Sequence, residues 1–353
     1  MLALQALVTL AAALSVAAAP GITLRVEGAD TVTDVDNLKV STKITNSGDE
    51  TLRILHHPLG PLSKIPTNGF SLVNSKGSSA GFGGAVAKYV PTVAAANGAF
   101  TTLAPGESVT VDRDLSDAYN LTATGAGTYD VKPNELFYLV DDKKEVFTLK
   151  AQVSKAHKVN IKGRLAKARP EFDPTSSNHT LTKRGTFTNC IPLQQYVAGV
   201  AGGQAHNYAV AGIAHLDAMA IPSKRFITWF GGFDWGRGAT IRNILTPIKD
   251  VNFDSFRYDC SCTDQGVYAY VYPNDFGKIY FCGVFWKAPA TGTDTIGGTL
   301  VHEASHFYAI GGGTSDYAYG QSACKNLAIN NAGNAVRNAD NYEYFIENNP
   351  YQG

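Results

Sequence analysis

Hydrophobic and polar positions alternate in short runs through the first half of the chain. Runs such as NLKVSTKITN, SVTVDRDL and EVFTLKAQV end at turn residues, and they recur between residues 22 and 159. This period of two is typical of half-buried strands, because successive side chains point to opposite faces of a sheet. The pattern predicts an all-β, sandwich-like unit. Within it, His56 and His57 precede Pro58, and we interpret the pair as part of a surface turn.

The pattern changes its period in the second half of the chain. A long run rich in Ala and Gly opens at Pro192, and ATIRNILTPIKDV follows it; both favour helices. GVYAYVYP and KIYFCGVFW then alternate like two paired strands joined by NDFG. Further helices are expected around His302, from Asp316 to about Ile329, and around NADNYEYFIEN. These elements predict a mainly helical α+β unit with a small antiparallel sheet.

A polar stretch separates the two halves. Residues 160–184 contain Pro, Ser and charged residues without a hydrophobic period, which is typical of a linker. The stretch ends at Lys183-Arg184, a dibasic pair of the kind that secretory processing proteases cut. Since 353 residues suggest about two domains, we divide the chain into residues 20–184 and 185–353.

The first 19 residues predict the compartment in which the protein works. MLALQALVTLAAALSVAAA is apolar and ends in small residues, which is typical of a cleaved secretory signal. A membrane anchor is the alternative, but the run is alanine-rich and short for a bilayer span, and no other stretch is long enough. We therefore expect a secreted protein. Asn120 and Asn178 stand in glycosylation sequons, which suit export.

Cysteine usage agrees with export. The five cysteines, which all lie in the second half, are Cys190, Cys260, Cys262, Cys282 and Cys324. In an oxidising compartment they are expected to form disulfides, and because five is odd, at least one thiol is left over. Cys324 is the candidate, since it sits apart in a helix-like run. The formal net charge is zero and no basic block is visible, so nucleic acid is not an expected partner.

The sequence HEASH, residues 302–306, has the spacing of a metal site. On a helix, His302 and His306 lie on one face and can hold one ion, while Glu303 reaches a water bound to it. Catalytic zinc needs three protein ligands and a position for water. The longer pattern HExxHxxGxxH is not completed, because positions 309 and 312 hold Ala and Gly.

The third ligand has several candidates. Glu343 and Glu347 lie on a later predicted helix, and either could serve. Asp316 is nearer, ten residues after His306 across AIGGGTS. A glycine-rich turn of this kind lets the chain fold back on the preceding helix, which favours Asp316.

HEASH and GTSDYAYG together resemble the paired signature of the aspzincin metalloendopeptidases. The similarity extends over about residues 186–353 and is greater to the peptidyl-Lys branch of the family than to deuterolysin. The resemblance implies a zincin-like fold for this half, with one zinc ion bound by His302, His306 and Asp316.

The resemblance also assigns two catalytic roles. It implies that Glu303 is the general base and that Tyr319 donates a hydrogen bond to the oxyanion. If Asp316 begins a helix, a tyrosine three residues later lies on the same face and can reach the reacting oxygen. From the spacing alone, Tyr319 could instead be a core tyrosine.

The same resemblance implies disulfides between Cys190 and Cys260 and between Cys262 and Cys282. Cys324 then stays free. We expect it to be buried and inert, because nothing in the sequence indicates a lowered thiol pKa.

Asp340 and Glu343 are three residues apart and share a face of the last predicted helix. Two carboxylates side by side would make a cation-selective pocket, although spacing alone also fits a solvated helix face. The resemblance implies that this pair binds lysine on the carboxyl side of the scissile bond.

These inferences converge on a secreted zinc metalloendopeptidase made as a preproenzyme. Residues 1–19 are the signal, 20–184 the propeptide and linker, and 185–353 the catalytic domain. We expect a monomer whose partners are protein and peptide substrates and its own propeptide, without membrane attachment. The two alternatives are a deuterolysin-like protease of broader specificity and a secreted two-domain binding protein whose metal site is not catalytic.

Overall fold

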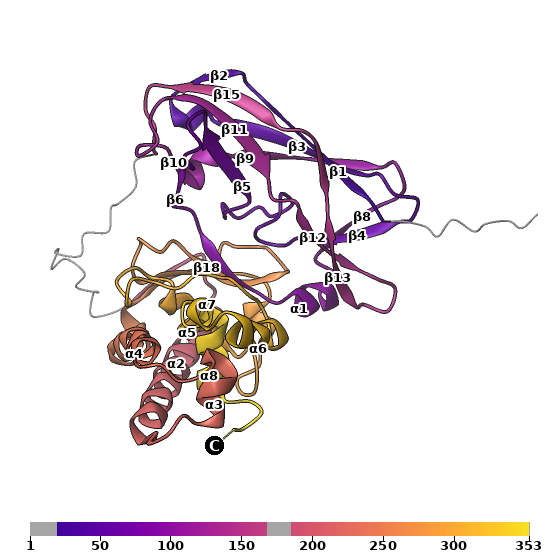
Figure 1. Cartoon of the computed structure of the whole chain (residues 1–353). Coiled ribbons are helices and arrows are strands. Elements are labelled where there is room, and N and C mark those ends of the chain that lie inside the picture. The colour runs from indigo at the N-terminus through magenta and orange to yellow at the C-terminus, as the bar shows by residue number, and fades with distance from the viewer. Residues whose placement is uncertain (1–19, 168–184, 353) are drawn as a thin grey trace, which may run out of the picture.

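The computed structural model of the chain describes residues 20–167 and 185–352 (Figure 1). The predicted signal, the dibasic pair Lys183-Arg184 and the sequon at Asn178 lie outside these residues, whereas Asn120 is exposed on the surface. In the part of the chain that the structure describes, no helix combines the length and the apolar character that a membrane span requires.

Residues 20–167, called the N-terminal region below, are built mainly of strands. Their elements are β1 (Ile22–Gly28), β2 (Thr31–Thr33), β3 (Lys39–Asn46), β4 (Leu52–Leu55), β5 (Phe70–Asn74), β6 (Gly81–Phe82), β7 (Val86–Tyr89), α1 (Pro91–Ala96), β8 (Phe100–Leu103), β9 (Ser108–Asp114), β10 (Tyr119–Asn120), β11 (Gly127–Pro133), β12 (Leu136–Val140), β13 (Val146–Lys150), β14 (Gln152–Lys155) and β15 (His157–Lys162). Every second residue of β3 is buried, as the alternation predicts. The linker interpretation is wrong at its start, because β15 continues to Lys162 and pairs with β11.

Three four-stranded sheets and one strand pair make up most of the N-terminal region. The orders are β14-β1-β3-β9, β2-β15-β11-β5 and β13-β12-β4-β8, with β10 paired to β6. Figure 1 shows these strands gathered in the upper half of the molecule. The strand β7 belongs to none of these sheets.

Residues 185–352, called the C-terminal region, are mainly helical. Their elements are β16 (Thr186–Thr188), α2 (Pro192–Ala218), α3 (Lys224–Phe230), α4 (Trp235–Asp250), β17 (Arg257–Asp259), β18 (Val267–Val271), β19 (Lys278–Phe281), α5 (Ile296–Ser305), α6 (Gln321–Asn330), α7 (Ala332–Ala335) and α8 (Ala339–Glu347). The predicted helices at Pro192, around His302 and around NADNYEYFIEN are confirmed. The helix expected from Asp316 is wrong at its start, because α6 begins only at Gln321.

The sheet of the C-terminal region has the order β16-β17-β19-β18-β7. The predicted pairing of β18 with β19 is confirmed and antiparallel. The sheet as a whole is mixed rather than antiparallel, because β16 and β17, and β17 and β19, run parallel. Its fifth strand, β7, comes from the N-terminal region and pairs antiparallel with β18.

The helix α5 lies at the centre of the C-terminal region. All of its residues are buried, and it packs against α2, α4, α8 and β18. Gly297 permits the close approach to α2, because a Cβ there would stand 2.6 Å from the Cβ of Gln204. A helix that is enclosed on all sides gives its side chains fixed positions, which suits a site that depends on geometry.

An apolar cluster joins the two regions around β7. The N-terminal region contributes Leu55, Ile65, Ala85, Ala87, Tyr89, Ala94, Ala95, Ala99 and Val140, and the C-terminal region contributes Val267 and Cys282. Tyr89 is fully buried in this cluster. The contact between the two regions is therefore stabilised by buried apolar side chains as well as by the pairing of β7 with β18.

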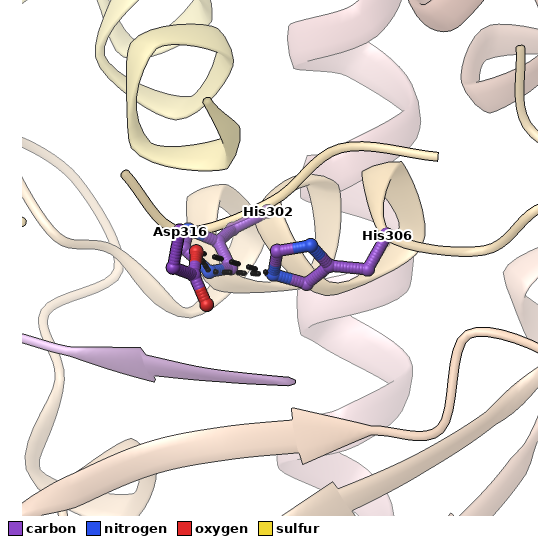
Figure 2. A group of neighbouring side chains, drawn as sticks. All are labelled: His302, His306 and Asp316. Carbon is purple, nitrogen blue, oxygen red and sulfur yellow. Dashed lines mark hydrogen bonds and ion pairs between the residues drawn. The ribbon is translucent and has the colours of Figure 1, made fainter. Parts of the chain in front are cut away.

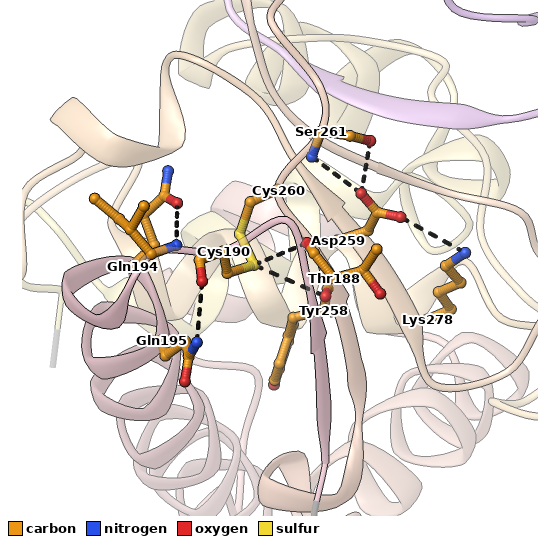
Figure 3. The surroundings of a disulfide bond; sticks show 10 residues. Thr188, Cys190, Gln194, Gln195, Tyr258, Asp259, Cys260, Ser261 and Lys278 are labelled. Carbon is orange, nitrogen blue, oxygen red and sulfur yellow. Dashed lines mark hydrogen bonds and ion pairs between the residues drawn. A yellow bond between two sulfur atoms is a disulfide. The ribbon is translucent and has the colours of Figure 1, made fainter.

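The C-terminal region contains two disulfides, Cys190–Cys260 and Cys262–Cys282. This is the pairing that the resemblance implies. The first joins the loop just before α2 to the residue directly after β17 (Figure 3). Cys324 is free and buried, as expected, and burial raises the pKa of its thiol.

Removing either disulfide by paired Cys→Ala substitution is expected to destabilise the protein, and by different amounts. The sequence separations are 70 residues for Cys190–Cys260 and 20 for Cys262–Cys282. Loop-closure entropy then predicts losses of about 4 and about 3 kcal/mol in the free energy of unfolding. Urea unfolding of the two double variants measures the difference. A larger loss for the shorter loop would show that packing around Cys282, rather than chain entropy, decides the effect.

Candidate active site

The helix α5 presents two histidines at its C-terminal end. The side chain of Thr295 accepts the N–H of Gly298 at 2.8 Å and fixes where the helix begins. His302 lies in the last turn, and His306 directly follows the helix. Their spacing puts both rings on one face, with the two Nε2 atoms 3.1 Å apart. Neither ring is exposed to solvent.

Asp316 reaches the same place from the loop after α5. Gly311, Gly312 and Gly313 have φ angles of 57°, 84° and 81°, which residues with a Cβ rarely adopt. The three glycines turn the chain back toward the helix. The predicted glycine-rich turn is therefore confirmed, and its physical basis is the left-handed backbone at consecutive positions.

A buried amide side chain holds the segment that carries Asp316. The Oδ1 of Asn338 accepts the N–H groups of Tyr317 and Ala318 at 2.7 and 3.0 Å. The N–H of Ser315 donates to the carbonyl of Arg337 at 2.8 Å. These bonds hold residues 315–318 in a non-helical conformation beside the start of α8, so the expectation that Asp316 and Tyr319 share a helical face is wrong.

The three side chains form a compact triangle of metal donors (Figure 2). The Nε2 atoms of His302 and His306 each lie 3.4 Å from Oδ1 of Asp316. Ligands bound to tetrahedral zinc at about 2.0–2.1 Å stand about 3.3 Å apart. Two imidazoles and one carboxylate are a donor set that catalytic zinc takes. The residues present therefore fit one zinc ion, and a set of three protein ligands leaves a fourth position for water.

Acceptors behind the rings fix the orientation of both histidines. The Nδ1 of His306 lies 3.1 Å from the carbonyl oxygen of Thr314, and the Nδ1 of His302 lies 2.8 Å from Oδ1 of Asp340. When the proton is on the Nδ1 that faces these oxygens, each ring presents the lone pair of its Nε2 to the metal position. Burial opposes the charge of Asp316, but His306 and His302 outweigh it and hold the pKa of this carboxyl below its usual value.

Glu303 lies on α5 beside this triangle and is fully buried. Its Oε1 accepts the N–H of Lys88 at 3.1 Å, while Oε2 has no hydrogen-bond partner among the described residues. Burial raises the pKa of Glu303 to about 7. A carboxylate with a pKa near neutrality can both take up and return a proton.

Tyr319 lies close to Asp316 and packs against side chains of the N-terminal region. Its ring centroid is 5.8 Å from that of Tyr89 and 5.7 Å from that of His57. Burial and the nearby charge of Asp316 raise the pKa of Tyr319, so its hydroxyl remains a donor. The surface-turn interpretation of His57 is wrong, because the ring is buried and stacks on Tyr138 at 4.4 Å between centroids.

Asp340 and Glu343 lie on one face of α8, as predicted, and both are fully buried rather than solvated. They converge with Asp294 on the ammonium group of Lys88 from the N-terminal region. Its Nζ is 2.5 Å from Glu343, 2.9 Å from Asp294 and 3.8 Å from Asp340. Burial alone would lower the pKa of Lys88, but the three carboxylates outweigh it and hold the pKa well above its usual value. The pocket formed by Asp294, Asp340 and Glu343, called the lysine pocket below, thus keeps a lysine side chain charged.

Sequence reasoning missed three residues of this lysine pocket. The Nζ of Lys88 lies 4.8 Å from the ring centroid of Tyr268 and 5.6 Å from that of Tyr344, within the range of cation–π contacts. The hydroxyl of Tyr344 donates to Asp294 at 2.9 Å. Asp294 precedes α5, and no local pattern pairs it with α8. Only the packing of the two helices brings it into the pocket.

Comparison with known proteins places this site in a family. The chain matches the family model described as lysine-specific metallo-endopeptidase over residues 215–347. That range contains the metal triangle, Glu303, Tyr319 and the residues that the C-terminal region contributes to the lysine pocket.

Individual relatives match over larger parts of the chain. The peptidyl-Lys metalloendopeptidase of Grifola frondosa is 44% identical over 351 residues, which cover 98% of each chain. An extracellular protease of Aeromonas hydrophila is 31% identical over 323 residues, 89% of each chain. A solved zinc peptidase from Grifola frondosa is 47% identical and aligns over 46% of this chain and 100% of its own, with a TM-score of 0.46. The similarity to the first two relatives runs through both halves of the chain.

Proposed function

Because this chain belongs to the lysine-specific aspzincin metalloendopeptidases, which are zinc endopeptidases, we propose that it hydrolyses peptide bonds on the amino side of lysine. The observation that carries the lysine specificity is the buried ammonium group held among Asp294, Asp340 and Glu343. A pocket of this charge rejects apolar side chains, because its carboxylates would then be buried without a cation.

We propose that His302, His306 and Asp316 hold one zinc ion. When bound there, zinc lowers the pKa of a water molecule and polarises the scissile carbonyl. The Nδ1 contacts of the two histidines with Thr314 and Asp340 support this assignment, because they orient both rings toward one point.

The remaining chemistry belongs to Glu303 and Tyr319. Glu303 takes a proton from the attacking water and delivers it to the leaving amine, for which its raised pKa is suited. Tyr319 donates a hydrogen bond from its hydroxyl group to the oxygen on which negative charge develops. This role is supported by the hydroxyl of Tyr319, which stays protonated near Asp316. Helical spacing does not support it, because Asp316 and Tyr319 do not share a helix.

The domain limits and the route of maturation follow from the same proposal. Residues 1–19 serve as a signal, 20–184 as a propeptide and linker, and 185–353 as a zincin-like catalytic domain. The apolar run of the first residues, which ends in small side chains, and the name of the extracellular relative support secretion. The enzyme acts as a monomer on proteins and peptides.

Digestion of a denatured protein by the processed chain tests the proposed function. Most new N-termini, mapped by mass spectrometry, are expected to begin with lysine. A zinc chelator such as 1,10-phenanthroline is expected to abolish cleavage, and added Zn²⁺ is expected to restore it, because the water and the carbonyl both depend on the metal.

The outcomes of this digestion separate the alternatives. Chelator-sensitive cleavage with scattered N-termini would overturn lysine specificity and favour a deuterolysin-like protease. Absence of cleavage by a processed, zinc-loaded chain would favour a binding protein. The Glu303→Gln chain, prepared in parallel, controls for contaminating proteases.

A further inference from the structure

The strand β7 occupies the edge of the C-terminal sheet beside the candidate active site. It pairs antiparallel with β18, with Val86 opposite Val271 and Ala87 opposite Tyr270. In Figure 2, a purple strand from the N-terminal region passes beside the three metal-binding side chains. An extended segment that adds to a sheet edge is a common mode of peptide binding, in which the main chain gives affinity and side-chain pockets give specificity.

The backbone of β7 meets the candidate catalytic groups. The N–H of Lys88 donates to Oε1 of Glu303 at 3.1 Å, and the N–H of Ala87 donates to Oδ2 of Asp316 at 3.3 Å. The nitrogen of the Ala87–Lys88 peptide bond therefore faces the carboxylate that would protonate a leaving amine. This is the placement expected of a substrate whose scissile bond precedes lysine.

We propose that β7 is a built-in, substrate-like inhibitor, in which Lys88 occupies the lysine pocket and keeps the full chain latent. This inference rests on the proposed function, because it names the occupant of that pocket before activation. Lys88, Glu303 and Glu343 have no exposed surface, so a protein substrate cannot enter while the strand is in place.

The charge of Lys88 is the anchor of this inhibitor. Three carboxylates surround its Nζ, and removing one partner of a buried ion pair is strongly destabilising, since the other charge stays buried without compensation. The apolar packing of Ala87 and Tyr89 adds to the attachment but does not select lysine. Loss of the charge alone should therefore release the strand.

The substitution Lys88→Met tests the proposal, because methionine keeps the length of the side chain and removes the charge. We expect the full, uncut chain to hydrolyse a quenched peptide with one Xaa-Lys bond at an initial rate about 100-fold above that of the wild-type chain. Mass spectrometry at the end of each assay verifies that the chain is uncut. Lys132→Met, at an exposed position of β11, is the matched control and is expected to leave the low rate unchanged.

The same assay distinguishes failure of this inference from failure of the proposed function. If the processed wild-type enzyme cuts before lysine but full-length Lys88→Met is no faster than full-length wild type, inhibition by Lys88 is overturned and the function stands. If neither the processed enzyme nor Lys88→Met cuts before lysine, the proposed function fails.

Hydrogen exchange gives a second readout that does not depend on activity. In the full chain carrying Glu303→Gln, which cannot cut itself, the amides of residues 86–89 are expected to be as protected as those of β18. Adding Lys88→Met is expected to lower protection in both strands while leaving β3 unchanged. Unprotected amides at residues 86–89 in the Glu303→Gln chain would overturn the proposal, because an inhibitory strand must be docked most of the time.

Discussion

Replacing Glu303 by Gln is expected to lower kcat/KM for cleavage before lysine by about 10⁴-fold, the upper end of what a general acid–base residue contributes. The effect is large because one carboxylate serves both proton transfers. Glutamine has the same shape, and Glu303 is not one of the three metal donors. Zinc content, measured by atomic emission, is therefore expected to remain at one ion per chain.

Asp275→Asn is the matched control for this carboxylate-to-amide change. Asp275 forms a partly exposed ion pair with Arg257 on the surface of the C-terminal region, so activity should stay within about twofold of wild type. If the zinc-loaded Glu303→Gln enzyme kept more than about a tenth of the wild-type kcat/KM, the proton transfers would have to be assigned to another group.

Replacing Glu343 by Gln is expected to lower kcat/KM for Xaa-Lys bonds by about 10²–10⁴-fold. Its carboxylate makes the shortest contact with the buried ammonium group, 2.5 Å, and losing one partner of such a pair costs about 3–5 kcal/mol. A substrate with norleucine in place of lysine has no ammonium group to lose and should be affected far less. The ratio of the two kcat/KM values is the measurement.

Zinc content and the norleucine substrate distinguish loss of lysine selectivity from loss of the metal. Glu343 Oε2 also lies 3.5 Å from Nδ1 of His302, so a variant that lost its metal would fail on both substrates. Equal losses for lysine and norleucine at full zinc occupancy would show that Glu343 supports the site without selecting its substrate.

Local signals in the sequence account for the parts of the site that could be predicted. Helical spacing predicts that His302, Glu303 and His306 lie together. Three consecutive glycines predict the turn that returns Asp316 to the helix. Asp340 and Glu343 follow from spacing together with the family resemblance. Each of these relations spans few residues or rests on a signature, so a single sequence could reveal it.

The features that escaped prediction depend on contacts between distant parts of the chain. Asp294 enters the lysine pocket, and His57 reaches Tyr319, only through tertiary packing. The parallel strands β16 and β17 have three residues each, too few to show a period. The segment after Asp316 is not helical, because the side chain of Asn338, some twenty residues away, accepts its amide N–H groups, an interaction that competes with helix formation.

Lys88 shows the same limitation most clearly. It stands in an ordinary short strand, AVAKY, where a charged residue predicts a solvated face. The structure buries it completely because the partner carboxylates come from residues more than 200 positions later. Nothing in the local pattern could have indicated that partner.

Asp340 contacts two parts of the proposed site at once, a histidine of the metal triangle and the ammonium group of Lys88. Its Oδ1 lies 2.8 Å from His302 and 3.8 Å from the lysine ammonium group, and its Oδ2 accepts the N–H of Gly320 at 2.7 Å. If His302 binds the metal and the pocket binds lysine, as we propose, the two affinities are linked through this carboxylate, and each ligand changes the affinity for the other by the same factor. Redesign toward another side chain would accordingly have to leave Asp340 in place and alter Glu343 and Asp294.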